Sequence, residues 1–298
     1  RADGNCRACM VEVEGERVLA ASCIREAAPG MVVRSAGSAR VQAARKGVLE
    51  LLLADQPERE ASPDRSSHLW DTADQLAIDA SSVRQRIPAH SERKEPTVHH
   101  VEPRPDSLVH AQGHDASHSA MNVNLDACIT CGLCERACRE VQGNDVIGLA
   151  HRGAASKVVF DFDDPMGDST CVACGECVQA CPTGALMPAT LIDAQGRGDS
   201  ATADRTVDSV CPYCGVGCQL TYHVKDEPAH VEGAAGEQRG GILFVEGKDG
   251  PSNQGRLCVK GRFGFDYPSH PARLTRPLIR REGIPKGLDP DFDPANPL

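Results

Sequence analysis

CITCGLCERAC (residues 128–138) and CVACGECVQACP (residues 171–182) carry the same cysteine spacing, C-x2-C-x2-C-x3-C. A [4Fe–4S] cubane needs four thiolates; three closely spaced cysteines wrap three of its corners, and the fourth cysteine of each run reaches the cluster of the other run. Each run is therefore expected to complete the ligand set of its neighbour. The two predicted sets are Cys128, Cys131, Cys134 and Cys181, and Cys171, Cys174, Cys177 and Cys138.

Zinc and disulfides are the competing interpretations of these thiols. Zinc sites generally combine two C-x2-C pairs, which gives no reason for the third and fourth cysteines to recur at the same spacing. Disulfide frameworks belong mainly to short secreted domains, whereas this chain has 298 residues and an odd number of cysteines, 15. The pattern therefore favours two cubanes.

The N-terminal stretch holds a third group of cysteines. Cys6-Arg-Ala-Cys9 and the more distant Cys23 supply three of the four ligands of a [2Fe–2S] cluster, and Gly4 lets the backbone pass close to it. The spacing resembles the long-loop [2Fe–2S] ferredoxin domain at the front of multi-cluster redox subunits, whose first cysteine would precede Arg1. We therefore expect the chain to be an internal fragment that begins inside this domain.

A fourth group begins with CPYCGVGC, residues 211–218, and ends with the remote Cys258. This spacing differs from that of the two C-x2-C-x2-C-x3-C runs, called the first ladder (128–138) and the second ladder (171–181) below. It favours one self-contained [4Fe–4S] cluster on Cys211, Cys214, Cys218 and Cys258. Lys260 lies two residues beyond the last ligand, where a cation could sit between the cluster and its electron donor. A structural zinc with an ordinary surface lysine is the alternative.

Local patterns predict several regular elements. Ser38 can cap a helix whose apolar face includes Val41 and Leu52 and which ends before Pro57. Strands are predicted at Met10–Val13, Arg17–Ala20, Met31–Arg34, Lys157–Phe162, Gln219–Val224 and Ile242–Val245.

Charge and hydropathy restrict the partners. The formal net charge is −10 and the isoelectric point about 5.6, which argues against nucleic acid. No apolar run approaches the roughly 18 residues that a membrane span needs. Thiolate-held cubanes are prone to oxidation, so a reducing cytoplasm is the expected location.

With these motifs, the chain resembles the N-terminal part of the alpha (large, catalytic) subunit of soluble, NAD-dependent, molybdenum- or tungsten-containing formate dehydrogenases. The matching segments are EVQG (140–143), CPYCGVGC, GRLCVKGRFGFDY (255–267) and HPARLTRPL (270–278). The resemblance implies a bis-molybdopterin guanine dinucleotide cofactor beside the CPYCGVGC cluster, with Lys260 between cluster and pterin as a cofactor-binding, electron-transfer residue. It also implies that electrons from formate reach NAD through a flavin- and NAD-binding beta subunit, with a small [2Fe–2S] gamma subunit as a further partner.

The resemblance implies an α+β multi-domain fold with three cubanes and one [2Fe–2S] cluster. The expected regions are a β-grasp [2Fe–2S] ferredoxin-like remnant at 1–57, a linker with a degenerate histidine/three-cysteine cluster region at 58–120, a two-[4Fe–4S] ferredoxin-like domain at 121–195, and the C-terminally truncated [4Fe–4S] domain of a molybdopterin oxidoreductase at 206–298.

Two departures from the family pattern are expected to matter. The stretch LADQPEREASPDRSSHLW (53–70) contains no cysteine and has Gln56 where the family has a histidine ligand, so that additional cluster is predicted to be absent. All fifteen cysteines are assigned to clusters, so no catalytic metal ligand is expected in this chain. The alternatives are an electron-transfer subunit of an NADH dehydrogenase or an iron-only hydrogenase, and an electron-transfer module without chemistry of its own.

Overall fold

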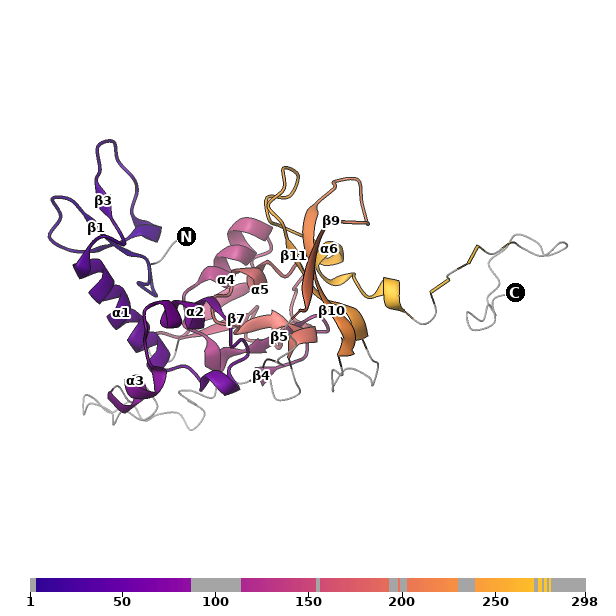
Figure 1. The fold of residues 1–298 in the computed structure, drawn as a ribbon, viewed down its shortest axis with the longest axis horizontal. Coiled ribbons are helices and arrows are strands. Elements are labelled where there is room, and N and C mark those ends of the chain that lie inside the picture. The colour runs from indigo at the N-terminus through magenta and orange to yellow at the C-terminus, as the bar shows by residue number, and fades with distance from the viewer. Residues whose placement is uncertain are drawn as a thin grey trace.

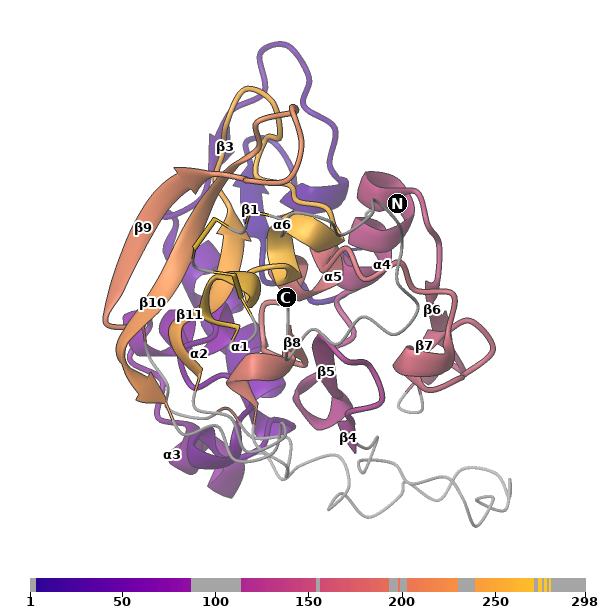
Figure 2. The ribbon, with the colours of Figure 1, turned by 90° about the vertical axis from the view of Figure 1, so that its right-hand side faces the viewer.

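The computed structural model describes residues 4–86, 114–153, 156–192, 198, 203–229 and 239–270, together with residues 273, 274, 276, 277 and 279. In Figure 1 a small sheet and α1 lie at one end, α4 and α5 occupy the middle, and the β9–β11 sheet lies on the opposite side of them. Figure 2, turned by 90°, shows α6 beside α5.

The N-terminal sheet has the strand order β2-β1-β3. Its strands are β1 (Met10–Val13), β2 (Ala20–Ala21) and β3 (Val33–Arg34), and β1 pairs antiparallel with both neighbours. Val11 and Val13 are buried, as the alternating pattern of β1 requires. The predicted strand at Met10–Val13 is therefore confirmed, whereas β2 and β3 are shorter than expected.

Helix α1 (Ala39–Ala54) begins where the sequence predicts. The Ser38 side chain accepts a hydrogen bond from the Val41 backbone N–H at 3.3 Å and so satisfies one of the free donors of the first turn. Val41, Leu49 and Leu53 are buried along one face.

Residues 58–86, expected to belong to a linker, form helices that cover α1 instead. Helices α2 (His68–Gln75) and α3 (Ala80–Arg86) follow, and Leu69 and Trp70 pack with Leu53 in one buried cluster. The Trp70 indole N–H donates to the Ser62 hydroxyl at 3.3 Å. The apolar face of α1 would otherwise remain exposed, which explains why a stretch rich in Ser, Asp and Arg is folded here. Residues 87–113 of the expected linker lie outside the described part of the chain.

The middle region contains both cysteine ladders. Strands β4 (His114–Asp115), β5 (Met121–Asn124) and β8 (Leu186–Pro188) form one sheet, and β6 (Ile147–Ala150) pairs with β7 (Lys157–Phe160). Helix α4 (Leu133–Arg136) continues into a π-helical segment, Ala137–Gln142, and α5 spans Glu176–Ala180. Cys134, Cys138 and Cys177 lie in the core of this region with Met121 and Phe160. Strand β7 confirms most of the predicted Lys157–Phe162 strand.

The last region is a three-stranded antiparallel sheet with one short helix. Its strands are β9 (Arg205–Val210), β10 (Gln219–Ala229) and β11 (Arg239–Gly247), followed by α6 (Val259–Phe263). Leu220, Val245, Leu257 and Phe265 form its core with Cys211. Strands β10 and β11 contain the predicted strands Gln219–Val224 and Ile242–Val245. Strand β9 was not predicted; all six of its residues are exposed, so it has no buried apolar face to mark it in the sequence.

Six further short 3₁₀ turns lie in the described part of the chain: Ser22–Ile24, Arg59–Ala61, Leu125–Ala127, Met166–Asp168, Ala189–Leu191 and Tyr267–Ser269.

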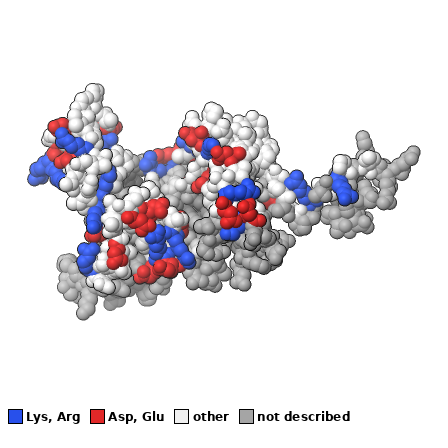
Figure 3. Space-filling model, viewed as in Figure 1, with Lys and Arg blue, Asp and Glu red and all other residues white. Residues whose placement is uncertain are grey.

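Exposed ion pairs connect the strands of the last sheet. Arg205 pairs with Asp226 at 2.8 Å, and Lys248 pairs with Asp208. Figure 3 shows such opposite charges side by side rather than gathered by sign on the face in view. Pairs as exposed as these contribute little to stability, so they fix local geometry more than the fold.

None of the helices in the described residues is both apolar enough and long enough to cross a lipid bilayer.

We predict that Leu53→Ala lowers the free energy of unfolding of the α1–α2 unit by about 2–5 kcal/mol, because it leaves a cavity in a fully buried site. Leu51→Ala on the same helix is the matched control, since Leu51 is 52% exposed and its truncation should stay within about 0.5 kcal/mol. Hydrogen exchange of the α1 amides measures both changes. Equal losses in the two variants would contradict the assigned core.

Candidate iron–sulfur centres

The first predicted ligand set meets around one small cavity. Cys128, Cys131 and Cys134 line it from the first ladder, and Cys181 lines it from the second. Apolar side chains complete the wall, among them Leu125, Val158, Ile129 and Leu186. Four thiols from two separate runs thus face a common space shielded from water.

The second predicted set lines another cavity in the reciprocal way. Cys171, Cys174 and Cys177 come from the second ladder, and Cys138, the last cysteine of the first ladder, reaches the cavity from the π-helical segment. Val146, Ile147, Phe160 and Met166 supply apolar wall. The structure therefore groups the eight ladder cysteines as the exchanged pattern expects.

The two ladder loops have matching backbones. Thr130 and Ala173 occupy equivalent positions and have φ angles of 49° and 55°, and Gly132 and Gly175 follow two residues later with φ angles of 75° and 73°. Each of these left-handed turns directs a backbone N–H at sulfur: Thr130 donates to Cys128 Sγ and Ala173 to Cys171 Sγ, both at 3.3 Å.

Sulfur of the exchanged cysteine Cys138 also accepts a backbone hydrogen bond, from the Val146 N–H at 3.3 Å. Such N–H···S bonds favour the charged thiolate and help to set cluster potentials.

Burial disfavours free thiolates at these positions. It raises the pKa of Cys128 to about 12 and that of Cys131 to about 11. It also raises the pKa of Cys134 and of Cys177, with neighbouring thiols acting in the same direction. A stable set of thiolates here needs cations among them, and iron ions are cations that thiolate ligands favour. The donor set, the shielding and the hydrogen bonds therefore fit two iron–sulfur clusters.

The fourth cysteine group comes together at the junction of β9, β10 and α6. The Cys211 backbone N–H donates to the Cys218 carbonyl at 2.8 Å, and Cys258 directly precedes the first residue of α6. Burial and the neighbouring Cys211, Cys214 and Cys258 thiols raise the pKa of Cys218. Cys214 and Cys258 are exposed, in contrast to the ladder thiols.

Cys6, Cys9 and Cys23 also lie together at the N-terminal end. The Cys9 and Cys23 side chains are within hydrogen-bond reach of each other, and Cys6 is within electrostatic reach of Cys23.

The thiol groups follow one another through the molecule. Burial is the largest cause that raises the pKa of Cys131, and Cys181 and Cys6 act in the same direction. Cys134 of the first cavity is likewise within electrostatic reach of Cys177 of the second. These interactions link the N-terminal group to the first cavity and the first cavity to the second.

Lys260 and Gln56, the other residues singled out in the sequence, lie in different settings. Lys260 is exposed on α6 and makes no ion pair with any residue described in the structure. Gln56 is buried, and its side-chain amide donates to the carbonyl of Ala127, which directly precedes Cys128. The side chain at position 56, where the sequence resemblance predicts the absence of a histidine ligand, thus contacts the backbone just before the first ladder.

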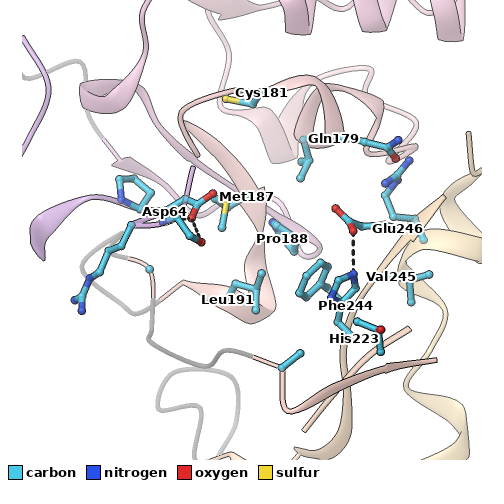
Figure 4. Close-up of a pocket in the computed structure, with 18 of the residues that line it drawn as sticks. Asp64, Gln179, Cys181, Met187, Pro188, Leu191, His223, Phe244, Val245 and Glu246 are labelled. Carbon is cyan, nitrogen blue, oxygen red and sulfur yellow. Dashed lines mark hydrogen bonds and ion pairs between the residues drawn. The ribbon is translucent and has the colours of Figure 1, made fainter. Parts of the chain in front are cut away.

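A larger cavity, of about 860 Å³, lies where three parts of the chain meet. Figure 4 shows Asp64 on one side, Cys181 and Gln179 above, and His223 with Glu246 on the other side. The His223 ring bonds the Glu246 carboxylate at 2.9 Å and so lowers its pKa. This cavity is not evident from the sequence, because its walls come from segments that only the folded chain brings together.

No three His, Cys, Asp or Glu side chains within the described ranges converge closely enough to hold a single metal ion.

Family models match three parts of the chain. Residues 1–37 match a 2Fe-2S iron-sulfur cluster binding domain, residues 127–185 a 4Fe-4S dicluster domain, and residues 204–270 a molybdopterin oxidoreductase Fe4S4 domain. Three successive regions of the chain are therefore similar to three kinds of iron–sulfur cluster binding domain.

Proteins with different names are similar to this chain in sequence. The chain is 32% identical over 280 residues to an NADH-quinone oxidoreductase protein of Rhizobium meliloti, covering 94% of this chain and 28% of the relative. It is 30% identical over 193 residues to a Staphylococcus haemolyticus protein named "Putative formate dehydrogenase", covering 53% and 18%. It is 27% identical over 277 residues to the NADPH-Fe(3+) oxidoreductase subunit alpha of Geobacter sulfurreducens, covering 93% and 28%. The chain thus spans less than a third of each relative.

We predict that Cys181 binds the same cluster as Cys128, and not the cluster held by the other cysteines of its own ladder. The double variant Cys128→Ala/Cys181→Ala should lose about four iron atoms, the same as either single variant, because both remove one cubane. Cys171→Ala/Cys181→Ala should lose about eight, since it removes both cubanes. Iron and sulfide analysis of the reconstituted proteins measures this. A larger loss in the first double variant than in the second would contradict the exchanged arrangement.

We predict that Gly175→Ala destabilises the region between α5 and α6 more than Gly143→Ala does. Both glycines have φ near +73°, so both variants carry the same backbone strain of about 1 kcal/mol. A Cβ at Gly175 would lie 2.1 Å from Cδ of Arg262, whereas one at Gly143 meets nothing within 4 Å. Thermal unfolding compares the two, and equal shifts would argue against this close approach.

Proposed function

We propose that the chain is the iron–sulfur electron-transfer region of a formate dehydrogenase alpha subunit, an enzyme that oxidises formate to CO2 and passes the electrons to NAD. The observation that carries the proposal is the convergence of cysteines from both ladders on two cavities with apolar walls, with Cys181 completing the first set and Cys138 the second. Bound clusters would supply one-electron carriers at these two neighbouring sites. The assignment of formate as substrate rests on the sequence resemblance and on the relative of that name.

The chain's own residues would bind, shield and tune the clusters. The ligands would be Cys6, Cys9 and Cys23 for [2Fe–2S], the two exchanged ladder sets, and Cys211, Cys214, Cys218 and Cys258 for the third cubane. Apolar side chains such as Val158 and Phe160 exclude water from the ladder sites. The N–H groups of Thr130, Ala173 and Val146 stabilise negative charge on sulfur.

The face around the third cubane site is suited to meet the pterin-bearing part of the whole enzyme. Cys214 and Cys258 are exposed there, together with the apolar side chains Tyr213, Val216 and Val259. Exposed apolar groups that cluster in this way are typical of contact surfaces. Lys260 on the same helix as Val259 would place a positive charge between the cluster and the anionic pterin cofactor.

The cofactor and partners follow from the same proposal. A bis-molybdopterin guanine dinucleotide with molybdenum or tungsten would bind mainly to parts of the enzyme beyond this chain. A flavin- and NAD-binding beta subunit, with or without a [2Fe–2S] gamma subunit, would accept the electrons. The reducing cytoplasm would protect the thiolate-held clusters from oxidation.

An NADH-linked electron-transfer protein is the second candidate. Its support is the length of the similarity, which reaches 94% of this chain for the NADH-quinone oxidoreductase relative and 53% for the formate dehydrogenase-like relative.

A substrate comparison on the purified full-length enzyme separates the candidates. Formate with NAD, NADH with a quinone, and hydrogen with NAD are offered under anaerobic conditions. Formate-dependent NADH formation, with no activity from the other two pairs, is the expected result. NADH-dependent quinone reduction without formate oxidation would overturn the formate proposal in favour of the second candidate.

We predict that Lys260→Ala in the full-length enzyme lowers formate turnover by at least tenfold while leaving the iron content unchanged, since the lysine is exposed and is no ligand. Lys260→Arg should retain more activity because it keeps the charge. Lys46→Ala, an exposed lysine on α1, is the control and should be neutral. Wild-type turnover in Lys260→Ala would remove this residue from the electron path.

A further inference from the structure

A buried ion pair joins the second ladder to the helix that follows Cys258. Arg262 on α6 and Glu176 on α5 approach to 2.9 Å, and their side chains are 4% and 8% exposed. They lie 86 positions apart in the sequence and belong to different cluster regions. Buried charges of this kind occur where each is paired, because an unpaired one would be strongly unfavourable.

Further hydrogen bonds tie this pair directly to the two ligand loops. The guanidinium Nε of Arg262 donates to the backbone carbonyl of Cys174 at 2.8 Å. Glu176 accepts a second bond, at 3.2 Å, from the backbone N–H of Leu257, the residue that precedes Cys258. Arg262 thus contacts the backbone of a predicted ligand in the second ladder. Glu176 contacts the backbone next to a predicted ligand of the fourth cysteine group.

The approach of α6 to α5 is also too close to leave room for a side chain at position 175. Cδ of Arg262 lies against Gly175, where a Cβ would come within 2.1 Å. At the edge, the Gln179 side chain donates to the Gly255 carbonyl at 3.0 Å. These contacts fix the position of α6 relative to α5, and with it the position of the fourth cysteine group relative to the second cavity.

The pair also places balanced charge beside the second ladder. A cation near a cluster favours the reduced, more negative state, and an anion opposes it, with little screening in a buried site. Arg262 and Glu176 together therefore have a small net effect on the reduction potential of the nearest cluster, whereas either one alone would shift that potential.

We propose that Arg262 and Glu176 are positioning residues that hold the Cys138/Cys171/Cys174/Cys177 cluster against the Cys211/Cys214/Cys218/Cys258 cluster and balance the charge between them. The proposal rests on the clusters of the proposed function but not on its substrate. An apolar pair could fill the same space with similar stability, so stability alone does not explain a buried ion pair here. The physical reason is that the pair fixes the position of α6 against α5 and balances the charge between the two clusters.

The test is an EPR-monitored redox titration of the full-length, reconstituted protein. Arg262→Gln should lower the potential of the second ladder cluster, because it leaves Glu176 unbalanced, and Glu176→Gln should raise it. The double variant should return close to the wild-type potential. Arg205→Gln, which removes an exposed arginine of β9, is the control and should leave all potentials unchanged.

Opposite shifts in the single variants separate charge balance from simple loosening, which would shift both in the same direction. Unshifted potentials, or shifts of the same sign, overturn the proposal. If a single variant loses iron, hydrogen exchange decides: loss of protection confined to residues 174–177 and 257–262 supports the positioning role, and loss throughout the chain overturns it.

The same preparations distinguish this proposal from the proposed function. A wild-type protein that holds three cubanes but does not oxidise formate overturns the formate assignment alone. A wild-type protein that binds no cubane overturns both.

Discussion

The convergence of buried cysteines from two separate ladders is the constraint on which the rest of the structure depends. Cys181 meets the first ladder and Cys138 meets the second, so neither run can close its own site alone. Burial makes free thiolates unfavourable there, as the raised pKa of Cys128 shows. Cations among the sulfurs would remove that penalty, so folding of this region and cluster binding are expected to be linked.

The other parts of the chain are arranged around this centre. The N-terminal cysteines reach it near Cys131, and α1 and α2 form a small core that positions Gln56 behind Ala127. On the other side, Arg262 and Glu176 connect it to α6. Cys214 and Cys258 of the fourth group are exposed, whereas the ladder cysteines are buried or half-buried.

The sequence predicts those features that depend on local spacing. The ladders, the Ser38 cap, strand β1 and the core segments of β10 and β11 all follow from short patterns. The region of the helices at residues 68–86 has an amphipathic stretch near Leu69 to Ile78, but its polar composition favoured a linker; packing against the apolar face of α1 explains why it folds. The Arg262–Glu176 pair was missed for a different reason: each residue alone has the character of an ordinary charged surface side chain, and only the tertiary fold buries them together.

The most direct test of the central claim is Mössbauer spectroscopy with iron quantification on the chain reconstituted anaerobically with ⁵⁷Fe. The account predicts about 12 iron atoms in cubane environments, four for each of three [4Fe–4S] clusters. Iron close to zero, with zinc bound to the same cysteines, would contradict it.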